Sequence, residues 1–202
     1  MRKTVFLLLS IVFIALAGCL GISQPYPDIT MYSLNLERKA DQPKEEGALA
    51  LKMTTFYVSP RFESKSLVYK TSDFVYETDY YNKFMVSPSS MISEQVNQWL
   101  SASPKIKYLA DSRFSRHVDY TLEGDVLELY GDFRDKDKPK AVLTIELGLL
   151  DEAKSPPETV LQEIYSQEIV LDERSVSKLI NAFNQGLRNI MLDFEADLDS
   201  IK

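Results

Sequence analysis

Hydrophobic side chains recur at helical spacing in two segments of the chain. Ser87-Pro88 predicts the start of the first helix, because the hydroxyl can cap free amides and proline suits the first helical position. Its apolar face should consist of Met91, Ile92, Val96, Trp99 and Leu100, and Pro104 should end it. The second helix begins near Val176 and keeps the 3.6-residue period for about six turns. Its expected buried positions are Leu179, Ile180, Phe183, Leu187, Ile190, Met191, Phe194 and Leu198.

The second helix could pack on a core or lie on a membrane surface. Its polar side carries the acidic run from Asp193 to Asp199, which an anionic bilayer would repel, and it lacks a stripe of Lys and Arg. We therefore expect core packing. We assign the acidic run to solvent, with no role.

Alternation of apolar and polar residues at period two predicts strands. The clearest strand runs from Ala141 to Leu149, and residues 161–171 should be its neighbour at an edge. Further strands are expected at residues 29–36, 48–58, 67–70, 74–78 and 106–109. Another crosses residues 118–129, where the pleat changes phase, and Gly124 is the expected bulge. With charged loops at residues 38–47 and 132–140, the pattern predicts a single α/β domain.

The first nineteen residues have the form of an export signal. Two basic residues, Arg2 and Lys3, precede a 13-residue run from Val5 to Ala17 that is apolar except for Ser10. A spanning helix needs roughly 20 apolar residues, so this run is short for a permanent anchor. It ends in Leu16-Ala17-Gly18-Cys19, which resembles a bacterial lipobox and contains the only cysteine of the chain. We expect residues 1–18 to be a lipoprotein signal peptide.

Acylation of Cys19 would attach the protein to a membrane without spanning it. Several acyl chains bind persistently, because each buried methylene adds about 0.8 kcal/mol. Residues 19–30 should then form the acylated N-terminus and an extended tether, and residues 31–202 the domain. Leu20 stands where an inner-membrane retention signal would usually place Asp, so we expect attachment to the outer membrane, facing the periplasm. The mature chain would keep 21 basic and 30 acidic side chains.

Composition excludes several classes of function. With one cysteine and one histidine, the chain cannot form a Cys/His zinc site, an iron–sulfur site or a disulfide scaffold. Its net charge of -7 argues against nucleic acid as a partner. The chain contains neither a G-x-G-x-x-G sequence nor a Walker sequence. We expect no cofactor and no resident metal.

Catalytic arrangements find little support in the sequence. His117 and Asp119 would lie side by side on a strand, and neither Ser112 nor Ser115 has an elbow or oxyanion nest to activate it. Carboxylates such as Glu123 alternate as they would on a solvated sheet face. We therefore expect no catalytic residues and no enzymatic activity.

An aromatic segment precedes the first helix. Phe74 and Tyr76 fit cross-strand packing. The later residues should lie in a loop, and loops rich in Tyr, Phe and Met often form protein contacts or line apolar clefts. The candidate partner-binding residues are Tyr80, Tyr81, Phe84 and Met85.

Three stretches together resemble the ABC-type transport auxiliary lipoprotein family. They are Leu67-Val68-Tyr69-Lys70, then Tyr80-Tyr81-Asn82-Lys83-Phe84, then Ser87-Pro88-Ser89-Ser90-Met91. Val58-Ser59-Pro60 matches a preceding Val-x-Pro step, and Asp119-Tyr120-Thr121-Leu122-Glu123-Gly124 resembles the central strand of the family. The similarity covers most of residues 30 to 195.

The resemblance implies a fold and a role. The fold would be a mixed sheet covered by helices, similar to anticodon-binding-like domains and to the N-terminal domain of TolB. The role would be a non-enzymatic accessory of an Mce-type or paraquat-inducible intermembrane lipid transport system, with an Mce-domain protein as partner. Two alternatives stay open: an activator or adaptor of a cell-wall or envelope enzyme, and a carrier that itself binds a phospholipid.

Overall fold

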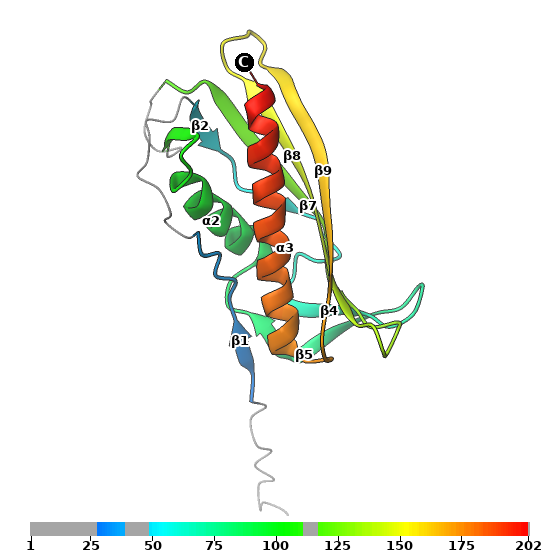
Figure 1. Cartoon of the computed structure of the whole chain (residues 1–202). Coiled ribbons are helices and arrows are strands. Elements are labelled where there is room, and N and C mark those ends of the chain that lie inside the picture. The colour runs from blue at the N-terminus through cyan, green and yellow to red at the C-terminus, as the bar shows by residue number, and fades with distance from the viewer. Residues whose placement is uncertain (1–27, 39–48, 111–116, 202) are drawn as a thin grey trace, which may run out of the picture.

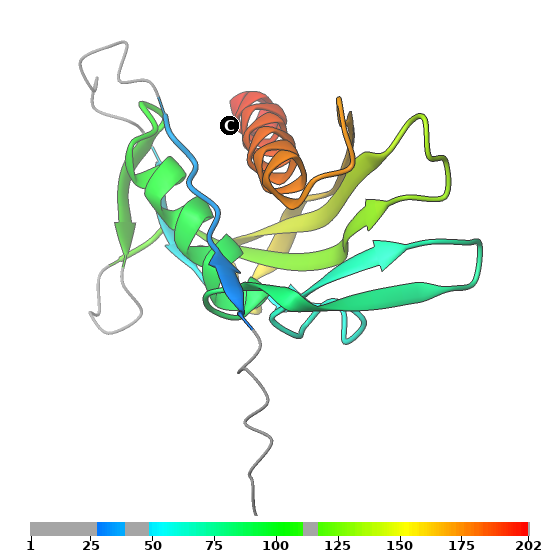
Figure 2. The same ribbon diagram turned by 90° about the horizontal axis from the view of Figure 1, so that it is seen from below.

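The computed structural model describes residues 28–38, 49–110 and 117–201. Within them the chain forms one mixed α/β domain, in which a nine-stranded sheet curves around two helices (Figures 1 and 2). The expected fold class is therefore confirmed. The predicted signal peptide, most of the tether and Cys19 lie outside the described residues.

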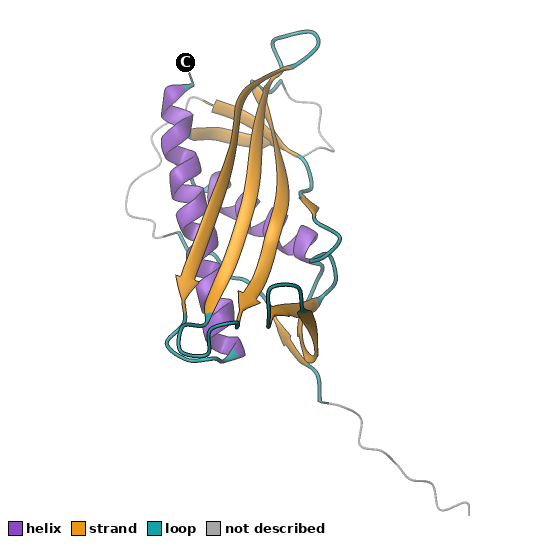
Figure 3. Cartoon of the chain, turned by 90° about the vertical axis from the view of Figure 1, so that its right-hand side faces the viewer, coloured by secondary structure: helices purple, strands orange, loops and turns teal. Residues whose placement is uncertain are grey.

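Strand β7 (Tyr120–Asp132) organises the sheet. One edge of β7 pairs in parallel with three short strands in succession: β2 (Leu49–Met53), β3 (Tyr57–Val58) and β4 (Ser66–Lys70). Its other edge pairs antiparallel with β8 (Lys140–Asp151), which in turn pairs with β9 (Glu158–Val170). No helix covers the outer face of these three long strands within the described residues (Figure 3).

Three further strands extend the two ends of the sheet. Strand β6 (Ile106–Ala110) lies beside β2, in parallel. Strand β5 (Tyr76–Phe84) forms a hairpin with β4, and β1 (Thr30–Tyr32) adds to β5 in parallel. The N-terminal end of the described chain therefore lies at the β4–β5 end of the domain (Figure 1).

Both helices begin as their sequences predict. Helix α2 (Pro88–Ser101) has Ser87 as its N-cap, whose hydroxyl accepts a hydrogen bond from the Ser90 amide. Helix α3 (Val176–Asp197) is capped in the same way by Ser175 and continues into a short 3-10 turn, Leu198–Ser200. Hydroxyl groups at these positions satisfy amides that no helical carbonyl can reach.

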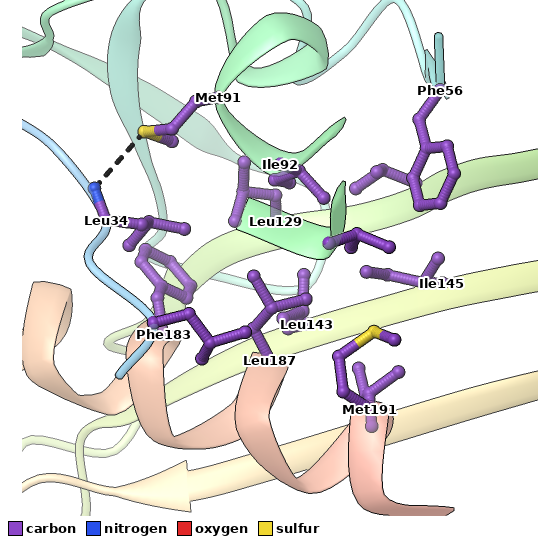
Figure 4. Close-up of a cluster of buried hydrophobic side chains, with 14 of the residues drawn as sticks. Leu34, Phe56, Met91, Ile92, Leu129, Leu143, Ile145, Phe183, Leu187 and Met191 are labelled. Carbon is purple, nitrogen blue, oxygen red and sulfur yellow. Dashed lines mark hydrogen bonds between the residues drawn. The ribbon is translucent and has the colours of Figure 1, made fainter. Parts of the chain in front are cut away.

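The core lies between the sheet and the two helices (Figure 4). All eight apolar positions expected on α3 are buried, as are all five expected on α2. At roughly 1.5 to 3 kcal/mol for each large apolar side chain, burial of these eight is enough to hold α3 on the sheet. The prediction that this helix packs on the core is confirmed.

Several strand predictions need correction. The expected first strand is regular only over β1, and residues 54–56 interrupt the strand expected over 48–58. The phase change in β7 is real, but it occurs between Val126 and Glu128 and not at Gly124. Gly124 instead faces the buried ring of Phe56, and a Cβ there would lie 2.6 Å from that ring.

Candidate functional site

The candidate residues Tyr80 and Tyr81 lie on strand β5 and not in a loop as expected. Pairing between β4 and β5 shifts register between Ser66–Lys83 and Val68–Thr78, so that one residue of β4 faces four of β5. The extra length forms a wide bulge that carries both tyrosines. Bulges re-aim side chains that a regular strand would direct otherwise.

Both tyrosine rings of the bulge are exposed. Tyr80 is 58% and Tyr81 57% accessible, and their rings meet edge to face with centroids 5.2 Å apart. The Lys83 ammonium lies 5.2 Å from the centroid of the Tyr80 ring. A cation over an aromatic face is attracted by the ring quadrupole, and it places a positive charge directly beside the exposed rings.

The carboxylate of Asp79 holds the bulge in shape. One oxygen accepts from the backbone amides of Tyr81 (2.8 Å) and Asn82 (2.9 Å). The other accepts from the Asn82 side chain (2.9 Å) and from the hydroxyl of Tyr69 (2.7 Å) on β4. A further hydrogen bond from the Tyr32 hydroxyl to Asn82 connects β1 to the same network.

These contacts change two pKa values. Partial burial acts to raise the pKa of Asp79, but the hydrogen bonds from Tyr69, Asn82 and the Tyr81 amide outweigh it and lower the pKa. Burial, together with donation to Asp79, raises the pKa of Tyr69. The proton therefore stays on Tyr69, and Asp79 is ionised at neutral pH.

One of the four candidate residues is not available to a partner. Phe84 is only 2% exposed, and its ring centroid lies 6.5 Å from that of Phe183 on α3. It therefore belongs to the core, and the interpretation of Phe84 as a contact residue is wrong for this structure. The neighbouring Met85 is 55% exposed.

Two exposed apolar side chains from nearby segments join the remaining candidates. Met31 on β1 is paired with Lys83 of β5, and Val86 follows Met85. The sequence indicated Met31 only as a strand residue, because nothing local shows that β1 pairs with the strand that carries the tyrosines. We call the exposed set the tyrosine surface: Met31, Tyr80, Tyr81, Met85 and Val86.

The segment after β1 forms a strap between the helices, residues 33–38. Its backbone amides donate to side chains on both sides: Leu36 to Gln95 of α2 (2.6 Å) and Asn35 to Asn184 of α3 (2.8 Å). The side chains of Leu34 and Leu36 are buried. The segment that follows β1 is thus fixed to both helices.

Arg38 ends the strap with a pair that the sequence did not predict. Its guanidinium lies 2.6 Å from the carboxylate of Glu195 and 4.8 Å from the centroid of the Trp99 ring. Glu195 is buried, so the interpretation of the whole acidic run as solvated was wrong. Asp197 also has a partner, because its carboxylate accepts from the Tyr165 hydroxyl at 2.7 Å.

The structure does not bring His117 and Asp119 together in a catalytic arrangement. The Asp119 carboxylate accepts from the amide of Ala50 at 2.8 Å, and the carbonyl of His117 accepts from the hydroxyl of Tyr108. Ser112 and Ser115 lie outside the described residues. Over residues 28–38, 49–110 and 117–201, no group of three His, Cys, Asp or Glu side chains could hold a metal ion.

Among the depressions on the surface of the described residues, two have volumes of about 670 and 640 Å³. The first is lined by charged residues of the β4–β5 and β7–β8 turns, including Arg134, which pairs with Asp132 and Asp73. The second lies between the strap and α3 and is lined mainly by amide side chains and Arg188. Neither has the apolar lining that an acyl chain needs.

Comparison with known proteins gives a fold and not a function. Searches found no match to a family model and none to a curated protein. Among solved structures, the protein XCC0632 from Xanthomonas campestris superposes with a TM-score of 0.71, covering 86% of this chain and all of that one at 16% identity. This chain shares its fold. The description of XCC0632 assigns it to the family DUF330.

A second structure supports the same architecture. The hypothetical protein CT253 from Chlamydia trachomatis superposes with a TM-score of 0.53 at 13% identity, covering 72% of this chain and 95% of that one. At these identities the comparison with both proteins establishes the arrangement of sheet and helices alone.

In the described part of this chain, none of the helices has the length and hydropathy to cross a bilayer.

Proposed function

We propose that this chain is a lipoprotein of the bacterial envelope that serves as a non-catalytic accessory of an Mce-type lipid transport system. In this proposal Cys19 is acylated, the domain faces the periplasm from the outer membrane, and it docks on a transport component. Energy for transport would come from a separate cytoplasmic ATPase.

One observation carries the proposal furthest. The three main stretches that resemble the auxiliary lipoprotein family lie close together between residues 67 and 91, and two of them meet in a single hydrogen-bonded network. Tyr69 of the first stretch donates to Asp79, which holds Tyr81 and Asn82 of the second. The third stretch caps α2 directly after this bulge. These three stretches therefore form one continuous part of the structure, the β4–β5 hairpin and the start of α2. It lies beside β1, where the predicted tether joins the domain.

The acylated tether gives a physical reason why a small interface with the transporter would be enough for stable docking. An acyl anchor confines the domain to one membrane, so docking on a transporter in the same envelope becomes a local event at high effective concentration. A weak contact can then stay occupied. The charged and amide side chains that line these two depressions suit a protein contact better than an acyl chain.

The decisive test is a pull-down of the acylated full chain from its native envelope in mild detergent, with mass spectrometry of co-purifying proteins and lipids. We expect recovery of an Mce-domain protein, and its loss when Cys19→Ala removes the anchor. Recovery of a cell-wall enzyme without any transport component would contradict the proposal and support the enzyme-activator alternative. Stoichiometric phospholipid without a protein partner would support the carrier.

A further inference from the structure

We infer that the tyrosine surface rests on the bilayer that holds the acylated N-terminus, and so sets the orientation of the domain on the membrane. This inference depends on the acylation of Cys19 in the proposed function. It assigns to Tyr80, Tyr81, Met31 and Met85 a lipid contact, where the sequence alone favoured a protein contact.

The position of β1 places the tyrosine surface next to the anchor. Thr30, the first residue of β1, pairs in parallel with Asn82, which directly follows Tyr80 and Tyr81, so β1 begins beside the bulge. Cys19 comes nine residues before Asp28. At about 3.3 to 3.6 Å per residue, the backbone of Cys19 cannot lie more than roughly 32 Å from Asp28, whatever the tether conformation.

The composition of the surface suits a membrane interface. Tyrosine has an apolar ring and a polar hydroxyl, and it is enriched where hydrocarbon meets water. Here two exposed tyrosines lie among exposed methionine and valine side chains. Two lysines border them: Lys83 over the Tyr80 ring, and Lys65, whose ammonium donates to the Met85 carbonyl. If the tyrosine rings lie at the membrane interface, these two lysines are close enough to the headgroups to contact lipid phosphates.

Charge elsewhere on the domain favours the same orientation. The last turns of α3 carry Asp193 and Asp197, the 3-10 turn that follows carries Asp199, and both lie at the opposite end of the domain from β1 (Figure 1). The outer sheet face displays Glu123, Asp125 and Glu146 around a shallow depression. An anionic membrane would repel both of these regions. On β5 and just before β1, beside the tyrosine surface, Asp28, Glu77 and the ionised Asp79 offset the charge of the two lysines, so this region has little net charge.

A lipid-borne quencher tests the contact. Acylation consumes the thiol of Cys19, so a cysteine introduced into the full chain is its only free thiol. Tyr81→Cys and the control Ile164→Cys are labelled with an environment-sensitive fluorophore, and the acylated proteins are placed in phosphatidylethanolamine–phosphatidylglycerol vesicles that contain doxyl lipid. Ile164 is a matched control because it is 59% exposed and lies on the outer face of β9, opposite Glu146.

We expect the label at position 81 to shift to shorter wavelength and lose fluorescence to the quencher, while the label at position 164 does neither. Equal quenching at both positions, or none at position 81, would overturn the inference. The same holds if position 81 becomes protected only when a partner protein is added. The mass of each protein is measured first: an unmodified Cys19 overturns the proposed anchor as well, whereas an acylated chain without quenching at position 81 overturns the membrane contact alone.

Discussion

At the scale of single residues, two glycines in neighbouring strands have opposite environments. Gly124 of β7 lies against the ring of Phe56, which is itself held by α2: the Phe56 amide donates to Ser93 at 2.8 Å, and its carbonyl accepts from Ser89 at 2.6 Å. Gly148 of β8 has nothing within 4 Å of the position of a Cβ. Position 124 therefore requires glycine because the Phe56 ring approaches its Cα closely, and not because the strand forms a bulge there.

Gly124→Ala should lower the free energy of unfolding by about 1 to 3 kcal/mol, because the buried Phe56 ring must move to admit a methyl group. Gly148→Ala is the matched control and should change stability by less than about 0.5 kcal/mol, since its methyl group meets open space. Urea unfolding of both variants measures the difference. Equal stability of the two would show that Phe56 yields without cost.

The contact between Tyr69 and Asp79 should give stability that depends on pH. The pKa of Asp79 is lower in the folded chain than its ordinary value near 3.8, so its contribution is fully present above that value and is lost as the pH falls through the folded pKa. At neutral pH we expect a coupling free energy of about 1 kcal/mol between the two side chains, discounted for the partial exposure of the carboxylate.

A double-mutant cycle with Tyr69→Phe and Asp79→Ala measures this coupling by urea unfolding across the acid range. The coupling should shrink as the pH falls below 3.8. A coupling that is constant from neutral to strongly acidic pH would mean that the carboxylate charge is not what holds the bulge.

At the scale of elements, the sequence pattern predicted those helices and strands whose formation depends on neighbouring residues in the chain. The 3.6-residue period located both helices, and Ser87-Pro88 placed the start of the first. Period-two alternation located β8 and its edge neighbour β9. Long-range pairing had no such signal: nothing in the sequence shows that β2, β3 and β4 share one edge of β7, or that β1 adds to β5. For the same reason the sequence found the tyrosines but misplaced Phe84, whose burial depends on α3.

Helix α3 should be required for folding through its inner face alone. Phe183→Asp places a charge beside Phe84 in the core and should unfold the domain, and Phe183→Ala should cost about 3 to 5 kcal/mol. Leu192→Ala, at a half-exposed position of the same helix, should cost less than about 1 kcal/mol. Thermal unfolding followed by circular dichroism separates them. An unchanged midpoint for Phe183→Asp would contradict the packing described for this helix.

At the scale of the whole molecule, the anchor and the fold should be separable. Cys19 lies outside the described residues, and the core consists of residues from Leu34 onward. Cys19→Ala should therefore leave the unfolding midpoint of the domain unchanged while abolishing its retention in the membrane fraction and its support of envelope integrity. Cell fractionation and complementation measure these effects. Full complementation by the unanchored protein would count against the proposed mechanism.

The parallel pairing of β1 with β5 also has a mechanical consequence. A pull on the N-terminus toward the membrane slides β1 along β5, so its three register pairs resist in shear together and do not open one after another. If these pairs break, the strap that follows β1 resists next, because the Leu36 and Asn35 amides are hydrogen-bonded to the two helices. In single-molecule pulling, a handle at position 19 should rupture the domain at a higher force than one at Phe74, which would peel the β4–β5 hairpin from β7 one pair at a time, starting at Lys70 and Asp132. A domain built in this way keeps its fold while its membrane attachment is under tension.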